Sequence, residues 1–198
     1  MNYIRKIEYK IVPKDSFPMI RNCSGCGGKS QFINTNSFRV NANGNRLDVW
    51  LIYQCASCKH TANLTIYERL RPDSISRDVY QGFLENKKEL AFRYGTDSHF
   101  FSKNKAEIEW SEVRYELQPI EDFKMPKMHP IDTNSRYSVS NPYVIKVRAE
   151  KIISELLQCS RTELKTMMKV GQIIVTERKE EHLILVEIAD SYQSKVLS

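Results

Sequence analysis

The chain has 198 residues, of which 41% are hydrophobic and 27% charged, and it carries a net charge of +6. This composition is that of a globular protein. The longest unbroken apolar run, Val49–Tyr53, is too short for a transmembrane helix, and the first ten residues lack the apolar stretch of a signal peptide. We therefore expect a cytoplasmic protein with no membrane partner.

The charge is unevenly distributed along the chain. Residues 1–71 carry a net charge of +7, residues 72–142 a net charge of −2, and residues 143–198 a net charge of +1. A basic segment is compatible with a polyanionic partner, but many basic proteins bind none. Charge alone therefore does not identify the partner.

The first predicted element is a half-buried strand over Tyr3–Val12. Two pairs of cysteines follow it in the sequence. Each pair has the spacing Cys-x2-Cys, and 28 residues separate the pairs. Zn²⁺ prefers four soft ligands in a tetrahedron, and the two-residue gap turns both sulfurs of a pair toward one point. Redox pairs or buried thiols are the competing interpretation, which is weaker because neither pair begins a helix. The pattern predicts Zn²⁺ bound by Cys23, Cys26, Cys55 and Cys58.

A β-hairpin is predicted between the two cysteine pairs. Asn43-Gly44 is the strongest short signal for a type I′ turn. The return strand is apolar on both faces, so we expect it to be covered on both sides within a larger domain. A third strand is predicted over Ala62–Leu70. Gly27 supports a sharp turn after the first cysteine pair, whereas Lys59 follows the second pair, so only the first pair has this support.

Residues 37–58, followed by the segment Thr61-Ala-Asn-Leu-Thr-Ile-Tyr-Glu-Arg69, resemble a bacterial family known as domain-of-unknown-function family 1062. The resemblance extends over most of the chain. It implies no biochemistry, because the family has no assigned function. The function has to be inferred from the residues.

The middle of the chain contains helices and one strand. Apolar residues recur at helical spacing over Asp78–Tyr94, and Asp97 is placed to cap a further short helix. Strict alternation over Glu112–Gln118 predicts a strand that completes the sheet of the N-terminal domain. Prolines punctuate residues 119–142, which we interpret as a linker.

The C-terminal segment is predicted to fold in the order strand, helix, helix, strand, strand. A capping box, with Ser160 at the N-cap and Glu163 three residues later, begins the second helix, and Gly171 ends it. The remaining elements are predicted over Tyr143–Val147, Ala149–Leu157, Gln172–Thr176 and Leu183–Ile188.

This segment resembles the small RNA-binding domain named after ribosomal small-subunit protein four. That family's pattern has Arg-Leu-Asp-Lys, then Ser-Arg, then a glycine before Val-x-Val-Asn-Gly. The chain departs from it at Ala149, in place of the leucine, and at Thr176-Glu177-Arg178, in place of the Asn-Gly turn. The matching residues are Arg148-Ala-Glu-Lys151, Leu156, Ser160-Arg161, Leu164, Gly171, Ile173 and Val175. The resemblance implies an RNA-binding fold.

A row of cations on the second predicted helix supports the same site independently. Arg161, Lys165 and Lys169 are spaced four residues apart, so they share one face of the helix. Such a row suits backbone phosphates, and the alternative is a solvated helix face. The predicted RNA-binding residues are Arg148, Lys151, Arg161, Lys165 and Lys169.

The sequence contains no Gly-rich phosphate loop, nucleophile elbow or zincin motif, and four cysteines leave zinc no open position for water. We therefore predict a protein that is not an enzyme. The predicted fold class is α+β, with a zinc-ribbon-centred antiparallel β domain containing a helix over residues 1–118. A linker over residues 119–142 leads to a small αα-β RNA-binding-type domain over residues 143–198.

The predicted function is non-catalytic RNA binding by a zinc-binding protein, with structured or ribosomal RNA as the partner. Two alternatives remain open. One is a DNA-binding regulator that uses the basic zinc ribbon. The other is a protein–protein adaptor whose cationic helix face is solvated.

Overall fold

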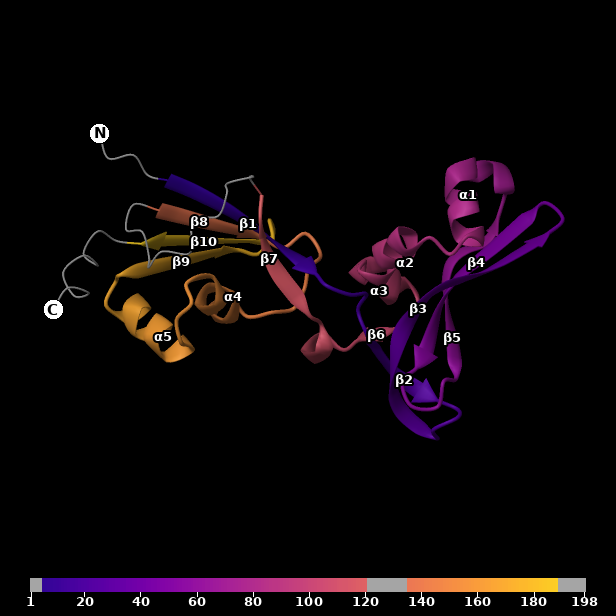
Figure 1. Cartoon of the computed structure of the whole chain (residues 1–198), viewed down its shortest axis with the longest axis horizontal. Helices are drawn as coiled ribbons and strands as arrows, with labels where there is room; N and C mark the ends of the chain where they lie inside the picture. The colour runs from indigo at the N-terminus through magenta and orange to yellow at the C-terminus, as the bar shows by residue number, and fades with distance from the viewer. Residues whose placement is uncertain (1–4, 121–134, 189–198) are drawn as a thin grey trace. The chain divides into compact units, whose positions relative to one another are not determined.

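The computed structural model describes residues 5–120 and 135–188, and it divides the chain into two compact units (Figure 1). We call Pro13–Arg114 the cysteine unit, and we call Met1–Val12 together with Tyr115–Ser198 the split unit. The described residues form two five-stranded sheets and five α-helices. The predicted α+β class is confirmed.

The cysteine unit is built on a sheet whose two longest strands form the predicted hairpin. Its strands are β2 (Met19–Cys23), β3 (Gly28–Asn43), β4 (Arg46–Cys55), β5 (Thr61–Leu70) and β6 (Glu107–Ile108). They are arranged in the order β5-β4-β3-β2-β6, and neighbouring strands run antiparallel. Strand β5 confirms the strand predicted after the second cysteine pair.

Strand β4 has one fully buried face and one that is partly open. The side chains Leu47, Val49, Leu51, Tyr53 and Cys55 alternate along the strand and are 0% exposed. Trp50 and Ile52, on the other face, are only half-buried. The expectation that β4 is covered on both sides therefore holds fully for one face and in part for the other.

The hairpin turn lies one residue later than predicted. Asn43 pairs with Arg46, so the two turn residues are Gly44 and Asn45. Of these two, Gly44 alone has positive φ, at 57°. Glycine with positive φ at the first central position is the pattern of a type II′ turn, which suits the strand twist as well as type I′ does.

The helix predicted over Asp78–Tyr94 is two helices, α1 (Arg77–Leu84) and α2 (Lys88–Gly95). Asn86 lies between them with a left-handed φ of 53°, and its side-chain oxygen accepts a hydrogen bond of 2.6 Å from the backbone N–H of Phe38. The first helix therefore ends at a left-handed residue, and the side chain of that residue contacts β3. Helix α3 (Ser98–Lys103) begins at Asp97, whose side chain accepts from the His99 N–H, as predicted.

Aromatic rings join the helices to the buried face of the sheet. The Phe83 ring of α1 lies 5.0 Å from Phe38 and 5.9 Å from Tyr67, measured between ring centroids. The Phe101 ring of α3 lies 5.9 Å from the Tyr53 ring. These contacts form the core of the cysteine unit and hold the sheet that carries the cysteines.

The split unit contains the second sheet and the remaining helices. Its elements are β1 (Arg5–Pro13), β7 (Tyr115–Pro119), β8 (Ser135–Ser140), α4 (Ala149–Leu156), α5 (Arg161–Lys169), β9 (Ile173–Arg178) and β10 (Leu183–Ile188). The strand order is β7-β1-β8-β10-β9, with β1 parallel to β8. The two helices, the capping box at Ser160 and the last two strands confirm the corresponding predictions for the C-terminal segment.

The predicted division into residues 1–118, 119–142 and 143–198 differs from these units. Strand β1 confirms the first predicted strand, but it pairs with β8, so the chain's first and last parts fold together. Strand β8 lies within the range interpreted as a linker, and residues 121–134 of that range lie outside the described residues. Pairing between distant segments produces this arrangement, and local sequence signals cannot show it.

The strand predicted over Tyr143–Val147 is wrong. The side chain of Asn141 accepts from the Ile145 N–H and donates to the Ile145 carbonyl, and Val144 has a left-handed φ of 53°. These two hydrogen bonds close a turn, so the backbone is not extended here.

Among the helices of the described ranges, none has the length and apolar character needed to span a bilayer.

Candidate metal centre and basic surface

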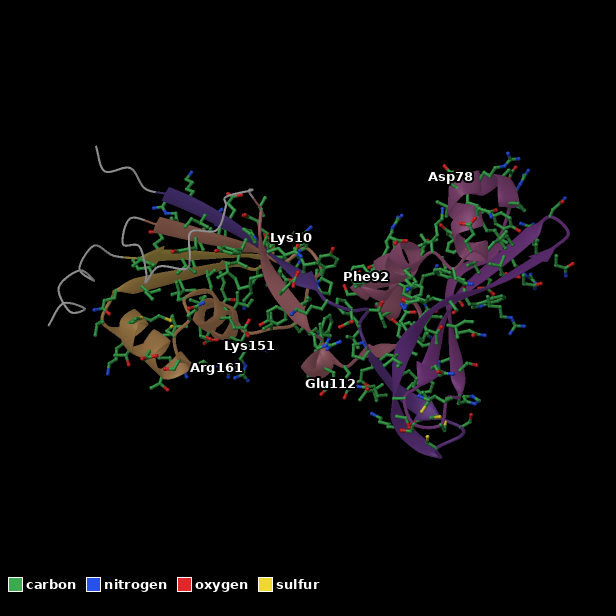
Figure 2. The ribbon with its side chains drawn as sticks, in the orientation of Figure 1. Lys10, Asp78, Phe92, Glu112, Lys151 and Arg161 are labelled. Carbon is green, nitrogen blue, oxygen red and sulfur yellow. The ribbon has the colours of Figure 1, made fainter. Side chains whose placement is uncertain are left out.

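The structure brings the four predicted cysteines together at one end of the cysteine unit's sheet. Their sulfur atoms all lie within 4.8 Å of one another, a separation that could hold a metal ion. Sulfur atoms of opposite pairs are closest, with Cys23 Sγ 3.3 Å from Cys58 Sγ and Cys26 Sγ 3.7 Å from Cys55 Sγ. Figure 2 shows yellow sulfur atoms gathered at this end of the sheet.

The two cysteine turns have the same backbone geometry. The Gly27 N–H donates to the Cys23 carbonyl at 2.9 Å, and the Lys59 N–H donates to the Cys55 carbonyl at 3.1 Å. The residue after each second cysteine is left-handed, with φ of 74° at Gly27 and 67° at Lys59. As predicted, only the first turn has a glycine at this position. Lys59 at the second turn therefore adopts a left-handed conformation that costs energy for a residue with a Cβ.

We expect Lys59→Gly to stabilise the cysteine unit by about 1 kcal/mol, because a non-glycine residue in the left-handed region costs roughly 1–2 kcal/mol. The greater freedom of glycine in the unfolded chain offsets part of that gain. Thermal unfolding of the metal-loaded protein measures the change. The matched variant Gly27→Ala should lower the midpoint. A lower midpoint for Lys59→Gly would show that the strain at this turn is negligible.

The pKa values of two cysteines show how strongly the four sulfurs influence one another. The backbone N–H of Cys58 is the largest influence on Cys55 and lowers its pKa to about 6. For Cys58, the His60 N–H also lowers the pKa, but the other three cysteine sulfurs and burial together raise it to about 12. Several thiolates this close repel one another, whereas a divalent cation among them would stabilise all four.

Besides the contacts between the sulfurs, two residues of the first cysteine turn, Ser24 and Gly25, lie against the second turn. Ser24 Oγ lies 3.0 Å from His60 Nε2. Gly25 lies against the cluster, since a Cβ at this position would be 2.8 Å from Cys58 Sγ. No local pattern in the sequence signals either contact, because each joins residues of the two separate cysteine turns.

Three of the predicted RNA-binding cations form the expected row. Arg161, Lys165 and Lys169 lie on α5 and are exposed, and the buried residue of that helix is Leu164. Arg148 is the N-cap of α4 and is exposed as well. Within the described residues, no salt bridge neutralises these four cations.

Lys151, the fifth predicted RNA-binding cation, is less exposed than the other four. It is half-buried, its Nζ lies 3.9 Å from Glu155 Oε1, and it lies 5.2 Å from the centroid of the Tyr115 ring. Burial is the largest influence on Tyr115 and raises its pKa, and nearby Glu155 acts in the same direction. Figure 2 labels Lys151 and Arg161 on neighbouring helices. Lys151 therefore has a structural role in joining α4 to β7.

The cysteine unit also contains an open cavity of about 560 Å³, whose lining includes Phe92 and Glu112, both labelled in Figure 2. Several lining side chains bind one another. Asn34 donates to Ser16 Oγ at 2.8 Å, and Arg114 pairs with Asp15 at 2.6 Å. These contacts hold β3 and the segment that leads to β7 against the loop that precedes β2.

One family model matches the chain, over residues 40–179, and its description is "Protein of unknown function (DUF1062)". The matched range includes Cys55, Cys58 and all five predicted cations, and it begins after Cys23 and Cys26. It covers parts of both units. No curated protein and no solved structure matches the chain.

Proposed function

The chain belongs to the DUF1062 family, whose description states no function, and we propose from its residues that it is a non-catalytic, cytoplasmic zinc-binding protein that binds RNA. The cysteine cluster supports the zinc part of this proposal. The cationic face of α5 supports the RNA part.

Zinc is the metal that the ligand set favours. Four thiolates in a compact cluster suit Zn²⁺, which accepts a tetrahedral sulfur set in structural sites. The geometry that supports this choice is the separation of at most 4.8 Å among the four sulfurs. A metal with four cysteine ligands has no open position for water, so its role is to stabilise the fold.

The observation that carries the RNA proposal is the row of three exposed cations on α5. Arg161, Lys165 and Lys169 are successive members of one helix face, and within the described residues no salt bridge satisfies them. Cations spaced along a helix match the repeating phosphates of a nucleic acid. Arg161 is also the first residue of α5, where the helix N-terminus favours anions.

We expect the double variant Lys165→Ala/Lys169→Ala to bind RNA more weakly while its thermal stability stays nearly unchanged, because both side chains are exposed. The slope of log affinity against log salt should become shallower by about 0.7 for each single-strand phosphate that the variant no longer neutralises. Titration of a labelled RNA at several salt concentrations measures both quantities.

A matched control removes the same charge elsewhere in the split unit. Lys6→Ala/Lys179→Ala changes one exposed lysine on β1 and one in the turn between β9 and β10. This variant should keep most of the affinity. Equal affinity of the α5 double variant and the parent at every salt concentration would place RNA binding elsewhere or exclude it.

A further inference from the structure

The outer face of the cysteine unit's sheet, opposite the buried one, presents a tryptophan among polar side chains. Trp50 of β4 lies directly opposite Arg39 of β3 on one side and Thr65 of β5 on the other. Residues directly opposite each other in neighbouring strands share a face. The next set in register on that face is Ser37, Ile52 and Asn63. We call these six residues the Trp50 face.

The side chains of the Trp50 face are accessible. Arg39 and Asn63 are exposed, and the other four residues, Trp50 included, are half-buried. The opposite face of β4 is fully buried beneath the aromatic residues of α1 and α3. The core of the unit is therefore complete without Trp50, and the indole ring remains available at the surface.

Arg39 and Trp50 form a cation–aromatic pair. The guanidinium carbon lies 5.8 Å from the centroid of the Trp50 ring. The guanidinium lies over one face of the ring, so the pair offers a nucleobase a flat, positively charged stacking surface, with a cation for the adjoining phosphate. The same face carries the small polar side chains of Ser37, Asn63 and Thr65, of which the Ser37 hydroxyl donates to the Thr35 carbonyl at 3.4 Å.

The positive charge of the cysteine unit is concentrated in its first part, which contains strands β2–β5 and the loops between them. Residues 13–71 contain eight Lys or Arg and three Asp or Glu, whereas residues 72–114 contain seven and eight. The segment that contains the Trp50 face is thus strongly basic, with Arg39 as the cation on the face itself, and the helical part is close to neutral. This charge is complementary to a nucleic acid backbone.

We propose that the Trp50 face binds the bases of single-stranded RNA by stacking, with Arg39 contacting the adjoining phosphate. The proposal rests on the RNA-binding function proposed above and adds a second surface, in the other unit, that recognises unpaired bases. Duplex RNA cannot offer its stacked bases to this ring, so the Trp50 face would discriminate single strands from duplexes.

Tryptophan fluorescence tests the proposal directly. The chain has two tryptophans, so the variant Trp110→Phe reports on Trp50 alone. A short uridine oligonucleotide should quench its emission saturably, and duplex RNA of the same length should quench it much less. Unchanged emission while a labelled oligonucleotide binds, or equal quenching by the duplex, would overturn the proposal.

Substitutions give a second measurement that does not depend on the Trp110 variant. Trp50→Leu should weaken binding of a labelled uridine oligonucleotide about ten-fold, whereas Trp50→Phe should retain most of the affinity. Arg39→Gln should weaken it more than Arg46→Gln, which removes an exposed arginine at the hairpin turn. Thermal unfolding checks that each variant is folded. Equal affinities for Trp50→Leu and Trp50→Phe would overturn stacking.

The same experiments separate this proposal from the function on which it rests. If Lys165→Ala/Lys169→Ala abolishes oligonucleotide binding while Trp50 emission never responds in the parent, the RNA-binding role of α5 stands and the Trp50 face fails. If the parent binds no RNA at any salt concentration, both proposals fail. If Trp50 is quenched in the parent and in the α5 variant alike, the Trp50 face is an independent RNA site.

Discussion

Cys55→Ser will remove the metal and unfold the cysteine unit. A serine hydroxyl stays protonated at neutral pH and does not replace a thiolate ligand of zinc. Structural zinc supplies roughly 10–16 kcal/mol of apparent binding free energy, which is comparable to the entire stability of a typical domain. Elemental analysis should find about one zinc per parent chain and none in the variant, and near-ultraviolet circular dichroism should show the loss of aromatic packing.

Cys159→Ser provides the matched control, because Cys159 is the one cysteine outside the cluster and is half-buried. That variant should keep its metal and its fold. A strong chelator added to the parent should reproduce the effect of Cys55→Ser. Retention of the aromatic circular dichroism signal by Cys55→Ser, or a parent protein without zinc, would refute a structural zinc centre.

Gly25→Ala is expected to weaken metal binding by about 10- to 100-fold, the range found when the surroundings of metal ligands are disturbed. A Cβ at position 25 would lie 2.8 Å from Cys58 Sγ, which is shorter than real Cβ contacts allow. The ligand sulfur or the turn around it therefore has to move. Competition with a chromogenic chelator measures the affinity.

Gly28→Ala tests whether the effect is specific to that contact. Gly28 is the first residue of β3, three positions after Gly25, and a Cβ at this position would meet nothing within 4 Å. We expect Gly28→Ala to hold its metal as tightly as the parent. Equal metal affinities for the two variants would mean that the turn relaxes at no cost and that Gly25 is not required.

Much of the local structure could be predicted from residues close together in the chain. The capping box at Ser160, the cap at Asp97 and the two strands near the C-terminus match the structure, because caps and alternation depend on neighbours within a few positions. The spacing of the cysteine pairs likewise indicated four ligands, and their sulfurs lie within 4.8 Å of one another.

Other features depend on contacts that local patterns do not contain. Asn86 lies between α1 and α2, and its side chain binds the N–H of Phe38, 48 positions earlier. Lys151 is half-buried because Tyr115 of β7 packs beneath its ammonium group. The periodicity of the helix and the charge of the lysine are both present in the sequence, but neither identifies the distant partner.

Spacing between residues was enough to predict that the four cysteines form one cluster, where the two C-terminal helices start, and that the α5 cations form a row. Contacts between distant segments were needed to show that β1 pairs with β8, and that Trp50 faces outward while its neighbours on β4 are buried. The physical reason is that side chains alternate between the two faces of a strand, so the sequence shows which residues share a face. Which of the two faces is buried depends on the elements that pack against it.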